Sequence, residues 1–399
     1  MSKSFKFISA SLLVNTKHSD GVPSSFFYIS LSKLMGHLKA DYTKNKWIGS
    51  SLTMLMAMAI SPASLAGTAV DYTNQDWQVV CDNTGTCRMA GYQADISSDF
   101  AASILLTRPA GASAEVTGEI KLGGNNKGSN KALLELGNRH RVALFINGKD
   151  LGETSSSALG AGYAKLSSTQ VKALLASLTK SSKIELVVRN SRWQVSDKGA
   201  AAVMLKADAA QGRVGTASAL VNPNASKSNA SVVAAKDMPQ LRLIVPDQIA
   251  NTNSNKGFSL KASQLQTMMQ ETITESTSDC PKLANKTPWR VNRLNSTQLL
   301  AQHSCWSGAY NTGDGMWVIN DTPPYNPKLI TTSATGYDNK GVISSVQKGR
   351  GIGDCLATTE WVWTGKSFTK SYEGTTGLCR LIADGGAWKL PTYVTDVKR

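Results

Sequence analysis

The residues of this chain best suited to chemistry are its six cysteines. They are Cys81, Cys87, Cys280, Cys305, Cys355 and Cys379. Cysteines act as metal ligands, as nucleophiles or as disulfides, and the redox state of the compartment decides which role they take. All six follow a short apolar segment that has the features of an export signal. An even number of cysteines in an exported chain predicts disulfides rather than zinc ligands or reactive thiols.

The spacing of the cysteines suggests how they pair. Six cysteines allow many pairings, so the choice rests on proximity along the chain. Two pairs each bracket a predicted β-hairpin, and the third pair is left by elimination. These pairs are Cys81–Cys87, Cys355–Cys379 and, by elimination, Cys280–Cys305.

Other residues that could catalyse a reaction are sparse. Only His140 and His303 follow residue 66. His140 lies among polar residues, which favours a surface side chain over a catalytic base. His303 lies two residues before Cys305, and a zinc site would need further ligands. There is no Gly-x-Ser-x-Gly motif of the kind that presents a nucleophilic serine in hydrolases. We therefore predict no catalytic residue, no metal and no cofactor.

Two short motifs resemble parts of known sites. Gly365-Lys366-Ser367 resembles the end of a phosphate-binding loop, but Glu360 stands where that loop needs a glycine. Ser177 and Ser367 are each followed three residues later by lysine, as in penicillin-binding enzymes, but the partner motifs are missing. The first motif is better interpreted as a hairpin turn, and four-residue matches like the second arise by chance.

Aromatic residues gather in the second half of the chain. The candidates for a binding face are Trp306, Tyr310, Trp317, Trp361 and Trp363. Aromatic faces suit sugar rings and peptide surfaces. The same residues could instead form the core, which is the commoner role of large aromatic side chains. Trp361 and Trp363 alternate along a strand and should share one face.

The export signal begins after several lysines. The uncharged stretch from Trp47 to Ile60 is followed by Ser61-Pro62 and by the small residues of Ser64-Leu65-Ala66. A basic start, a short apolar segment and small residues at the cut site are typical of a secretory signal. The stretch is too short to span a bilayer. We expect translation to begin at Met35 and cleavage near Ala66, which predicts a periplasmic protein without a stable transmembrane segment.

Charge narrows the class of partner. The formal net charge is +15, and it falls to +10 when the seven lysines and two acidic residues of 1–66 are removed. The basic residues are scattered and form no nucleic-acid-binding module, so nucleic acid is excluded as a partner. A solvated basic surface is favoured, with contact to an anionic surface as the functional alternative.

Short alternating segments predict an α+β, mainly β protein. Trp77–Cys81 and Cys87–Tyr92 flank the turn residues 83–86 and predict a hairpin, and a second hairpin is expected over 360–370. Apolar residues at helical spacing predict helices over 168–178 and near 265–273, and a third helix is expected over 200–210.

Length and composition predict two antiparallel, disulfide-stapled β-rich domains. We assign 1–66 to an N-terminal extension and cleaved signal, and 67–221 to the first domain. Residues 222–238 are rich in small polar residues and are interpreted as a linker. Residues 239–399 form the second domain, with four cysteines and the tryptophan cluster.

Several segments resemble a known family. Five segments resemble, in the same order along the chain, the motifs of a proteobacterial secreted family catalogued as domain of unknown function 1176. They are Trp77–Arg88, Ser196–Ala200, Gln211–Thr216, Gly308–Asn311 and Arg350–Cys355. The resemblance covers residues 72–395. The first half also resembles invasion-associated locus B proteins, which implies a periplasmic, non-enzymatic β-rich domain.

From these observations we expect an envelope protein that is not an enzyme. The leading hypothesis is a module that binds a protein or a cell-wall polymer, and a specific form of it is an inhibitor of a hydrolase. The alternative is a hydrolase of cell-wall or glycan substrates, which would need a cleft that joins a histidine to a serine or a carboxylate.

Overall fold

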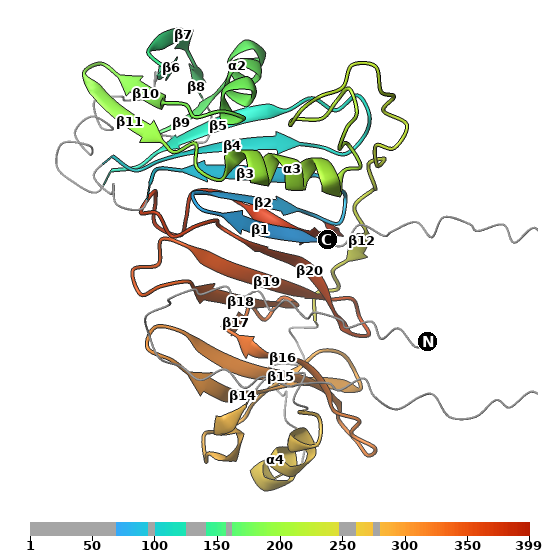
Figure 1. Cartoon of the computed structure of the whole chain (residues 1–399). Helices are drawn as coiled ribbons and strands as arrows, with labels where there is room; N and C mark the ends of the chain where they lie inside the picture. The colour runs from blue at the N-terminus through green and yellow to red at the C-terminus, as the bar shows by residue number, and fades with distance from the viewer. Residues whose placement is uncertain (1–68, 95–99, 125–140, 157–161, 247–260, 274–279) are drawn as a thin grey trace, which may run out of the picture. The chain divides into compact units, whose positions relative to one another are not determined.

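The largest sheet of the protein is antiparallel and seven-stranded. The structure is a computed structural model, and it describes residues 69–94, 100–124, 141–156, 162–246, 261–273 and 280–399. The strand order is β1-β2-β3-β4-β5-β9-β8 (Figure 1). Its strands are β1 (Val70–Asn74), β2 (Trp77–Cys81), β3 (Cys87–Tyr92), β4 (Ala102–Arg108), β5 (Thr117–Leu122), β8 (Ser155–Ser156) and β9 (Tyr163–Lys165). The predicted hairpin over Trp77–Tyr92 is confirmed, with Cys81 opposite Cys87.

A second, four-stranded sheet and two helices cover one face of this first sheet. The order of the second sheet is β11-β10-β6-β7. Its strands are β6 (Ala143–Ile146), β7 (Lys149–Glu153), β10 (Ile184–Val188) and β11 (Ser191–Val195). The helices are α2 (Ser168–Leu178) and α3 (Ala200–Ala210), both predicted. Helix α2 begins with a capping box between Ser167 and Gln170, which satisfies backbone N–H groups at its start.

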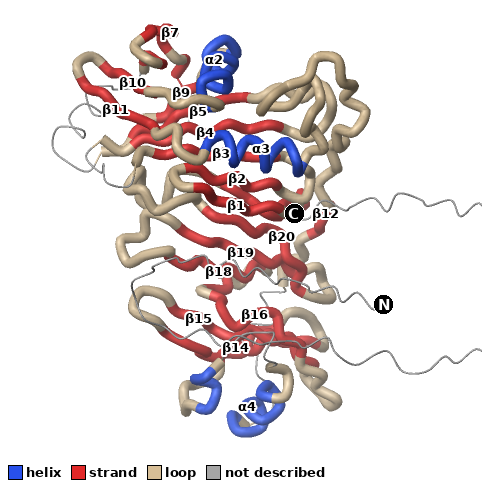
Figure 2. The backbone as a smooth tube through the Cα atoms, in the orientation of Figure 1, coloured by secondary structure: helices blue, strands red, loops and turns tan. Residues whose placement is uncertain are grey.

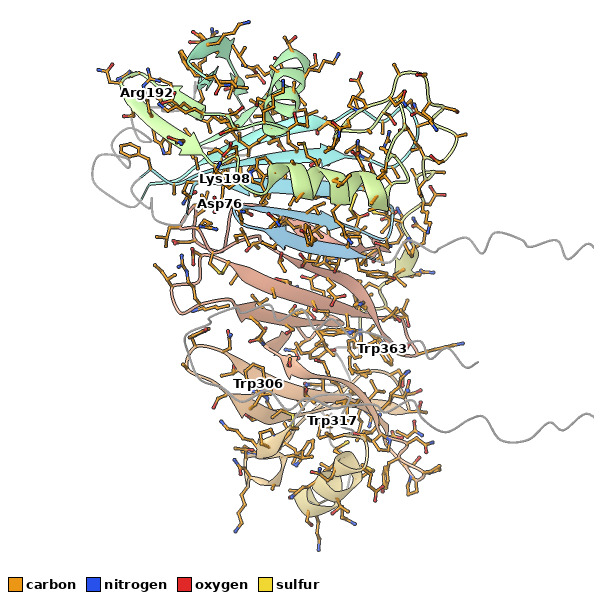
Figure 3. All side chains as sticks on the ribbon, viewed as in Figure 1. Asp76, Arg192, Lys198, Trp306, Trp317 and Trp363 are labelled. Atoms are coloured by element: carbon orange, nitrogen blue, oxygen red, sulfur yellow. A yellow bond between two sulfur atoms is a disulfide. The ribbon has the colours of Figure 1, made fainter. Side chains whose placement is uncertain are left out.

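The core between these layers is apolar and contains two tryptophans that also hydrogen bond. Trp77 and Trp193 are fully buried. The Trp77 indole N–H donates to the Ser196 carbonyl over 2.7 Å, and that of Trp193 donates to the Gly123 carbonyl over 3.0 Å. Gly199 has φ +92° and lies against the Asn74 carbonyl, so a side chain there would collide with the β1–β2 turn. The adjacent Asp76 and Lys198 are joined by a backbone hydrogen bond (Figure 3).

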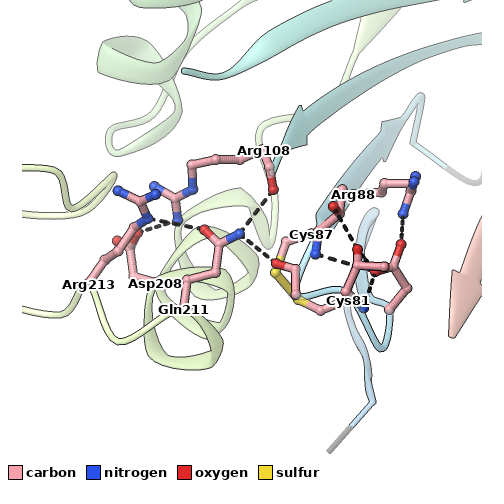
Figure 4. Close-up of a disulfide and its surroundings, with 11 residues drawn as sticks. Cys81, Cys87, Arg88, Arg108, Asp208, Gln211 and Arg213 are labelled. Atoms are coloured by element: carbon pink, nitrogen blue, oxygen red, sulfur yellow. Dashed lines mark hydrogen bonds and ion pairs between the residues drawn. A yellow bond between two sulfur atoms is a disulfide. The ribbon is translucent and has the colours of Figure 1, made fainter. Parts of the chain in front are cut away.

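Buried charges join the end of β4 to the end of α3. Arg108 and Asp208 form an ion pair over 2.7 Å, and both side chains are almost fully inaccessible. Asp208 also accepts the backbone N–H groups of Leu220 and Val221. Gln211 donates to the carbonyls of Gly85 and Arg108, and so connects this network to the turn beside the Cys81–Cys87 disulfide (Figure 4). These partners satisfy charges that would otherwise be costly to bury.

The second half of the chain contains two further antiparallel sheets. The third sheet has the order β13-β14-β15-β16, and the fourth has the order β17-β18-β19-β20-β21. The third sheet consists of β13 (Arg290–Arg293), β14 (Gln298–Ser307), β15 (Thr312–Asn320) and β16 (Lys328–Ala334). The fourth consists of β17 (Gly336–Tyr337), β18 (Val342–Lys348), β19 (Leu356–Trp363), β20 (Phe368–Thr375) and β21 (Leu390–Val394). The predicted hairpin over 360–370 is confirmed as β19–β20.

Two apolar cores lie on the two faces of the third sheet. One contains Leu300 and Met316 from the third sheet with Ile343 and Trp363 from the fourth. The other is covered by α4 (Ala262–Gln270) and the short helix η2 (Pro281–Ala284). In α4 the predicted apolar side is confirmed, since Leu265 and Met269 are buried. Most described elements are strands, so the fold is mainly β, as predicted (Figure 2).

The C-terminal segment covers the other face of the first sheet. Ile382, Ala387, Trp388 and Leu390 pack with Val80, Ala90 and Leu105. The Trp388 indole N–H donates to the Ser103 hydroxyl over 2.7 Å. A two-stranded parallel pair of β12 (Gln240–Arg242) and β22 (Asp396–Lys398) completes the sheets.

Residues 222–238 contain no helix or strand. Their backbone nevertheless forms hydrogen bonds to the first half of the chain. The Val233 N–H donates to the Gln211 carbonyl after α3, and the Lys236 N–H donates to the Thr84 carbonyl in the β2–β3 turn. The described residues cluster into one compact unit. The division into two domains with a linker stays a prediction.

The three disulfides are Cys81–Cys87, Cys280–Cys305 and Cys355–Cys379, the pairs chosen by proximity. Within the described residues, no helix is long and apolar enough to cross a membrane.

The packing of Trp388 generates a test of the C-terminal cover. We expect Trp388→Ala to lower the free energy of unfolding by about 3–5 kcal/mol, because it removes a large buried side chain and leaves a cavity. Trp388→Phe keeps most of the apolar ring but loses the hydrogen bond to Ser103. Loss of that bond should lower the free energy of unfolding by about 0.5–1.5 kcal/mol, and the smaller ring adds a smaller loss of packing. Guanidinium unfolding measures both. An unchanged midpoint for Trp388→Ala would contradict this role.

Candidate binding surface

The five aromatic residues singled out from the sequence have different environments. Trp317 and Trp363 are fully buried and belong to the two cores beside the third sheet (Figure 3). Trp361 is half-buried against the same core as Trp363. Trp306 is half-buried, and its indole lies across Gly313 on the neighbouring strand. Tyr310 has 47% of its surface exposed. The five therefore do not form one binding face, and Tyr310 is the member that is presented to solvent.

Tyr310 lies beside a second loop that also exposes an apolar side chain. We use the name ridge for the β14–β15 turn, residues 307–311, together with residues 346–354 at the end of β18. On this ridge Ile352 is 66% exposed, and Val346 at its base is 38% exposed. The sequence analysis did not single out Ile352. Its position between Gly351 and Gly353 was the available signal, because an apolar residue inside a tight turn has little core to enter.

Hydrogen bonds hold the two loops together. The Asn311 amide donates to the Lys348 carbonyl over 2.9 Å, and the Lys348 N–H donates back to the Asn311 side-chain oxygen over 2.8 Å. The Gly308 N–H closes the turn by donating to the Asn311 carbonyl. The Tyr310 hydroxyl lies 3.4 Å from the Gly349 carbonyl. The phenol thus lies over the second loop, while about half of the Tyr310 surface stays exposed.

An ion pair closes the second loop from within. Arg350 binds Asp354 with two nitrogens, over 2.7 Å from Nε and 2.5 Å from the terminal nitrogen. The Leu381 N–H donates to the same carboxylate over 2.7 Å. Burial opposes ionisation of Asp354, but these hydrogen bonds outweigh it and hold the pKa of the carboxyl below its ordinary value.

The Cys355–Cys379 disulfide anchors the base of this loop. Gly349 packs directly on it, since a Cβ at this position would lie 2.6 Å from Cys355 Sγ. Asp354, Cys355 and Cys379 carry three metal-ligand atoms close together. Two of these atoms are the sulfurs of the disulfide, which are not thiolates, so the group offers a metal one carboxylate.

Charges of both signs border the ridge. Lys348 and Asp384 are exposed, and the Lys282 ammonium donates to the Ser307 hydroxyl at the start of the β14–β15 turn. Asp384 precedes Gly385, whose N–H donates to the Gly353 carbonyl over 2.9 Å. An apolar centre with a polar rim of mixed charge is typical of protein interfaces.

A cavity of about 620 Å³ lies between the first sheet and the C-terminal segment. Its walls come from the first sheet, including Glu119 and Tyr163, and from residues 384–389. Lys121 lies over the Tyr163 ring, 3.5 Å from its centre. Burial lowers the pKa of Lys121 to about 8 and raises that of Tyr163. The Tyr163 hydroxyl donates to the Ala387 carbonyl, so this aromatic ring supports the wall.

Of the two histidines singled out from the sequence, His303 lies within the described residues and is buried. His140 lies outside the described residues. His303 is 2% exposed and lies against Trp289, with ring centres 4.6 Å apart. Its Nδ1 lies 2.9 Å from the Ser304 carbonyl, and its Nε2 lies 2.8 Å from the Thr287 hydroxyl. Because a carbonyl only accepts, Nδ1 donates to it and Nε2 accepts from Thr287. The ring thus fastens Thr287 to β14.

The Arg350–Asp354 pair generates a prediction about pH. A carboxyl whose pKa is lowered by folding stabilises the folded state at pH values above its pKa in the unfolded chain, which is about 4. This stabilisation is lost as the pH falls below that value, because the carboxyl becomes protonated. Asp354→Asn should therefore lower the melting temperature at pH 7, and the difference from the parent should shrink below about pH 4. Asp384→Asn, at an exposed neighbouring carboxylate, is the control and should change little. Equal differences for Asp354→Asn at pH 7 and pH 3 would contradict the role of the ionised pair.

Comparison with known proteins gives a family but no characterised relative. The family model described as "Protein of unknown function (DUF1176)" matches residues 71–395. No curated protein matches the chain, and no solved structure matches it. The likeness of the first half to invasion-associated locus B proteins stays a prediction. Because the match spans most of the chain, the protein belongs to the DUF1176 family.

Proposed function

We propose that this is an exported periplasmic protein that binds a protein or a cell-wall polymer and does not catalyse a reaction. The observation that carries the proposal is the ridge, where Tyr310 and Ile352 are exposed on loops held by hydrogen bonds, an ion pair and a disulfide. An exposed isoleucine gains nothing for the fold, whereas tyrosine and apolar anchors contribute strongly when an interface buries them.

The rigidity of the ridge supports binding rather than folding as its role. A loop that is already ordered loses little conformational entropy when a partner binds it. Arg350 and Asp354 bind each other across the second loop, and Asn311 binds the Lys348 backbone. The Leu381 N–H holds Asp354 from outside the loop. These bonds fix the backbone that carries Tyr310 and Ile352, and an exposed loop of this kind suits a partner with a pocket. Inhibition of a hydrolase, by insertion of the Ile352 loop into its cleft, is the specific form of this proposal.

Export is supported by the cysteines. All six are paired, and three disulfides in one chain are typical of an oxidising compartment. The apolar segment before Ala66 supplies the proposed signal.

A hydrolase is the second candidate, on one observation. The Thr287 hydroxyl bonds to His303 Nε2 while Nδ1 is oriented by a carbonyl, which is the arrangement of a nucleophile, a base and an orienting group. Incubation of the purified protein with peptidoglycan, followed by chromatography of released fragments, tests it. If the protein releases peptidoglycan fragments and His303→Gln abolishes the release, the hydrolase would replace the binding proposal. If no fragments are released, the result agrees with the binding proposal.

Binding through the ridge is tested with paired surface variants. Cell envelopes isolated from the producing bacterium are titrated with fluorescently labelled protein. We expect Tyr310→Ala with Ile352→Asp to weaken binding by at least about tenfold, because both apolar anchors are lost. Leu205→Asp, at a residue on α3 that is 45% exposed, is the matched control and should bind like the parent. Circular dichroism checks that each variant is folded. Equal binding by the ridge variant and the parent would exclude the ridge as the contact surface.

A further inference from the structure

A second cavity lies between strands of the third and fourth sheets. It has a volume of about 550 Å³, within the range of about 300–1,000 Å³ that is usual for ligand sites. Residues 289–292 at β13 form one wall, and residues 335–337 at β17 form another. Gln302 of β14 and Asn339 complete the lining. We call this cavity the slot. It shares no residue with the ridge.

The slot is bordered by the backbone of two strands as well as by a strand face. Side chains alternate between the two faces of a sheet, so a cavity against a face alone is lined by every second residue. Here Trp289, Arg290, Val291 and Asn292 are consecutive, and so are Thr335, Gly336 and Tyr337. The slot therefore runs along β13 and β17 themselves, and Gln302 adds the face of the inner strand β14.

Both strands are at the ends of their sheets. In the described part of the chain β13 pairs with β14 alone, and β17 pairs with β18 alone. An end strand presents a row of backbone N–H and C=O groups that no neighbouring strand satisfies. Such a row is the template for the addition of one more strand from a bound peptide.

The side chains of the slot favour an uncharged ligand. Arg290 is the cation of the lining, and it forms an ion pair with Asp314 over 2.9 Å. Gln302 donates to the same carboxylate over 2.7 Å. The remaining lining is mostly amide, hydroxyl and aromatic, and the Tyr337 ring is fixed edge-on against Phe368. Amide and hydroxyl groups suit a peptide backbone, and they offer little to an ionic polymer.

We propose that the slot binds an extended, uncharged peptide segment of another protein, which adds as a strand to the edge of β13 and reaches β17. The backbone of the peptide would satisfy the unpaired row of β13, and alternate side chains would contact Tyr337 and Trp289. The proposal goes beyond the function assigned to the ridge, because it names another site and another mode of recognition.

The chain offers a substitution that fills the slot without disturbing the fold. A Cβ added at Gly336 would meet no atom within 4 Å beyond its chain neighbours, and the residue does not have a positive φ. Gly336→Trp should therefore place an indole in the slot. Leu205→Trp is the matched control, because Leu205 on α3 is 45% exposed and belongs neither to the slot nor to the ridge.

Peptides selected by the parent protein from a phage-displayed random heptapeptide library provide the probe. We expect selected sequences to bind the parent, to bind Leu205→Trp equally, and to bind Gly336→Trp at least about tenfold more weakly. Methylation of alternate backbone nitrogens of the peptide should abolish binding, because an added strand must donate its N–H groups. Amide exchange at residues 290–292 should slow when the peptide is bound.

Four results would overturn the proposal. Three of them are selection of no peptide above background, equal binding by Gly336→Trp, and binding that survives backbone methylation. The fourth is binding of N-acetylglucosamine oligomers in the slot without any peptide. Failure of the ridge variants to change envelope binding would leave these measurements unaffected, so the two proposals fail separately.

Discussion

The arrangement of this protein depends on the need to bury both faces of the first sheet. Along β2 and β3, Val79 and Met89 point into one core, and Val80 and Ala90 point into another. A sheet with two apolar faces is stable in water only when a layer covers each face. The first cover comes from nearby sequence, but the second comes from the C-terminal residues around Trp388. The first sheet is therefore completed only when the end of the chain has been placed.

The same C-terminal segment also fixes the ridge. Leu381 donates its N–H to Asp354, and Gly385 donates to Gly353. Cys379 at the start of the segment is bonded to Cys355 at the base of the ridge loop. The segment thus contacts the apolar face of the first sheet on one side and the ridge on the other. Rigidity of the ridge follows from burial elsewhere, since the groups that hold it belong to a segment ordered by packing.

Local features were predictable from the sequence because they depend on neighbours in the chain. Turn residues between Cys81 and Cys87, and the apolar spacing of α2, specify their structures without distant contacts. Exposure of the aromatic residues was not predictable in this way. Alternation places Trp317 on one face of its strand, but both faces of that sheet are covered by segments distant in the chain. α4 and η2 cover the face of Trp317, and the fourth sheet covers the other. Arg108 and Arg213 are buried, against the usual exposure of arginine. Asp208 pairs with Arg108, and Arg213 donates to the Gly111 carbonyl and the Ser218 hydroxyl. These partners are distant in the chain or lie in turns, so the sequence did not indicate them.

The irregularity in β14 shows how a disulfide and the candidate surface are linked. Ser304 lies opposite Asp314 and Trp306 lies opposite Gly313, so Cys305 between them has no partner in the strand pair. A bulge of this kind bends a strand and changes the direction of the side chains that follow it. Cys305 uses its position to bond Cys280 beneath the sheet, in the core covered by α4 and η2. The disulfide therefore stabilises the irregular end of β14 from which the turn with Tyr310 projects, and the regular part of the same strand supplies Gln302 to the slot.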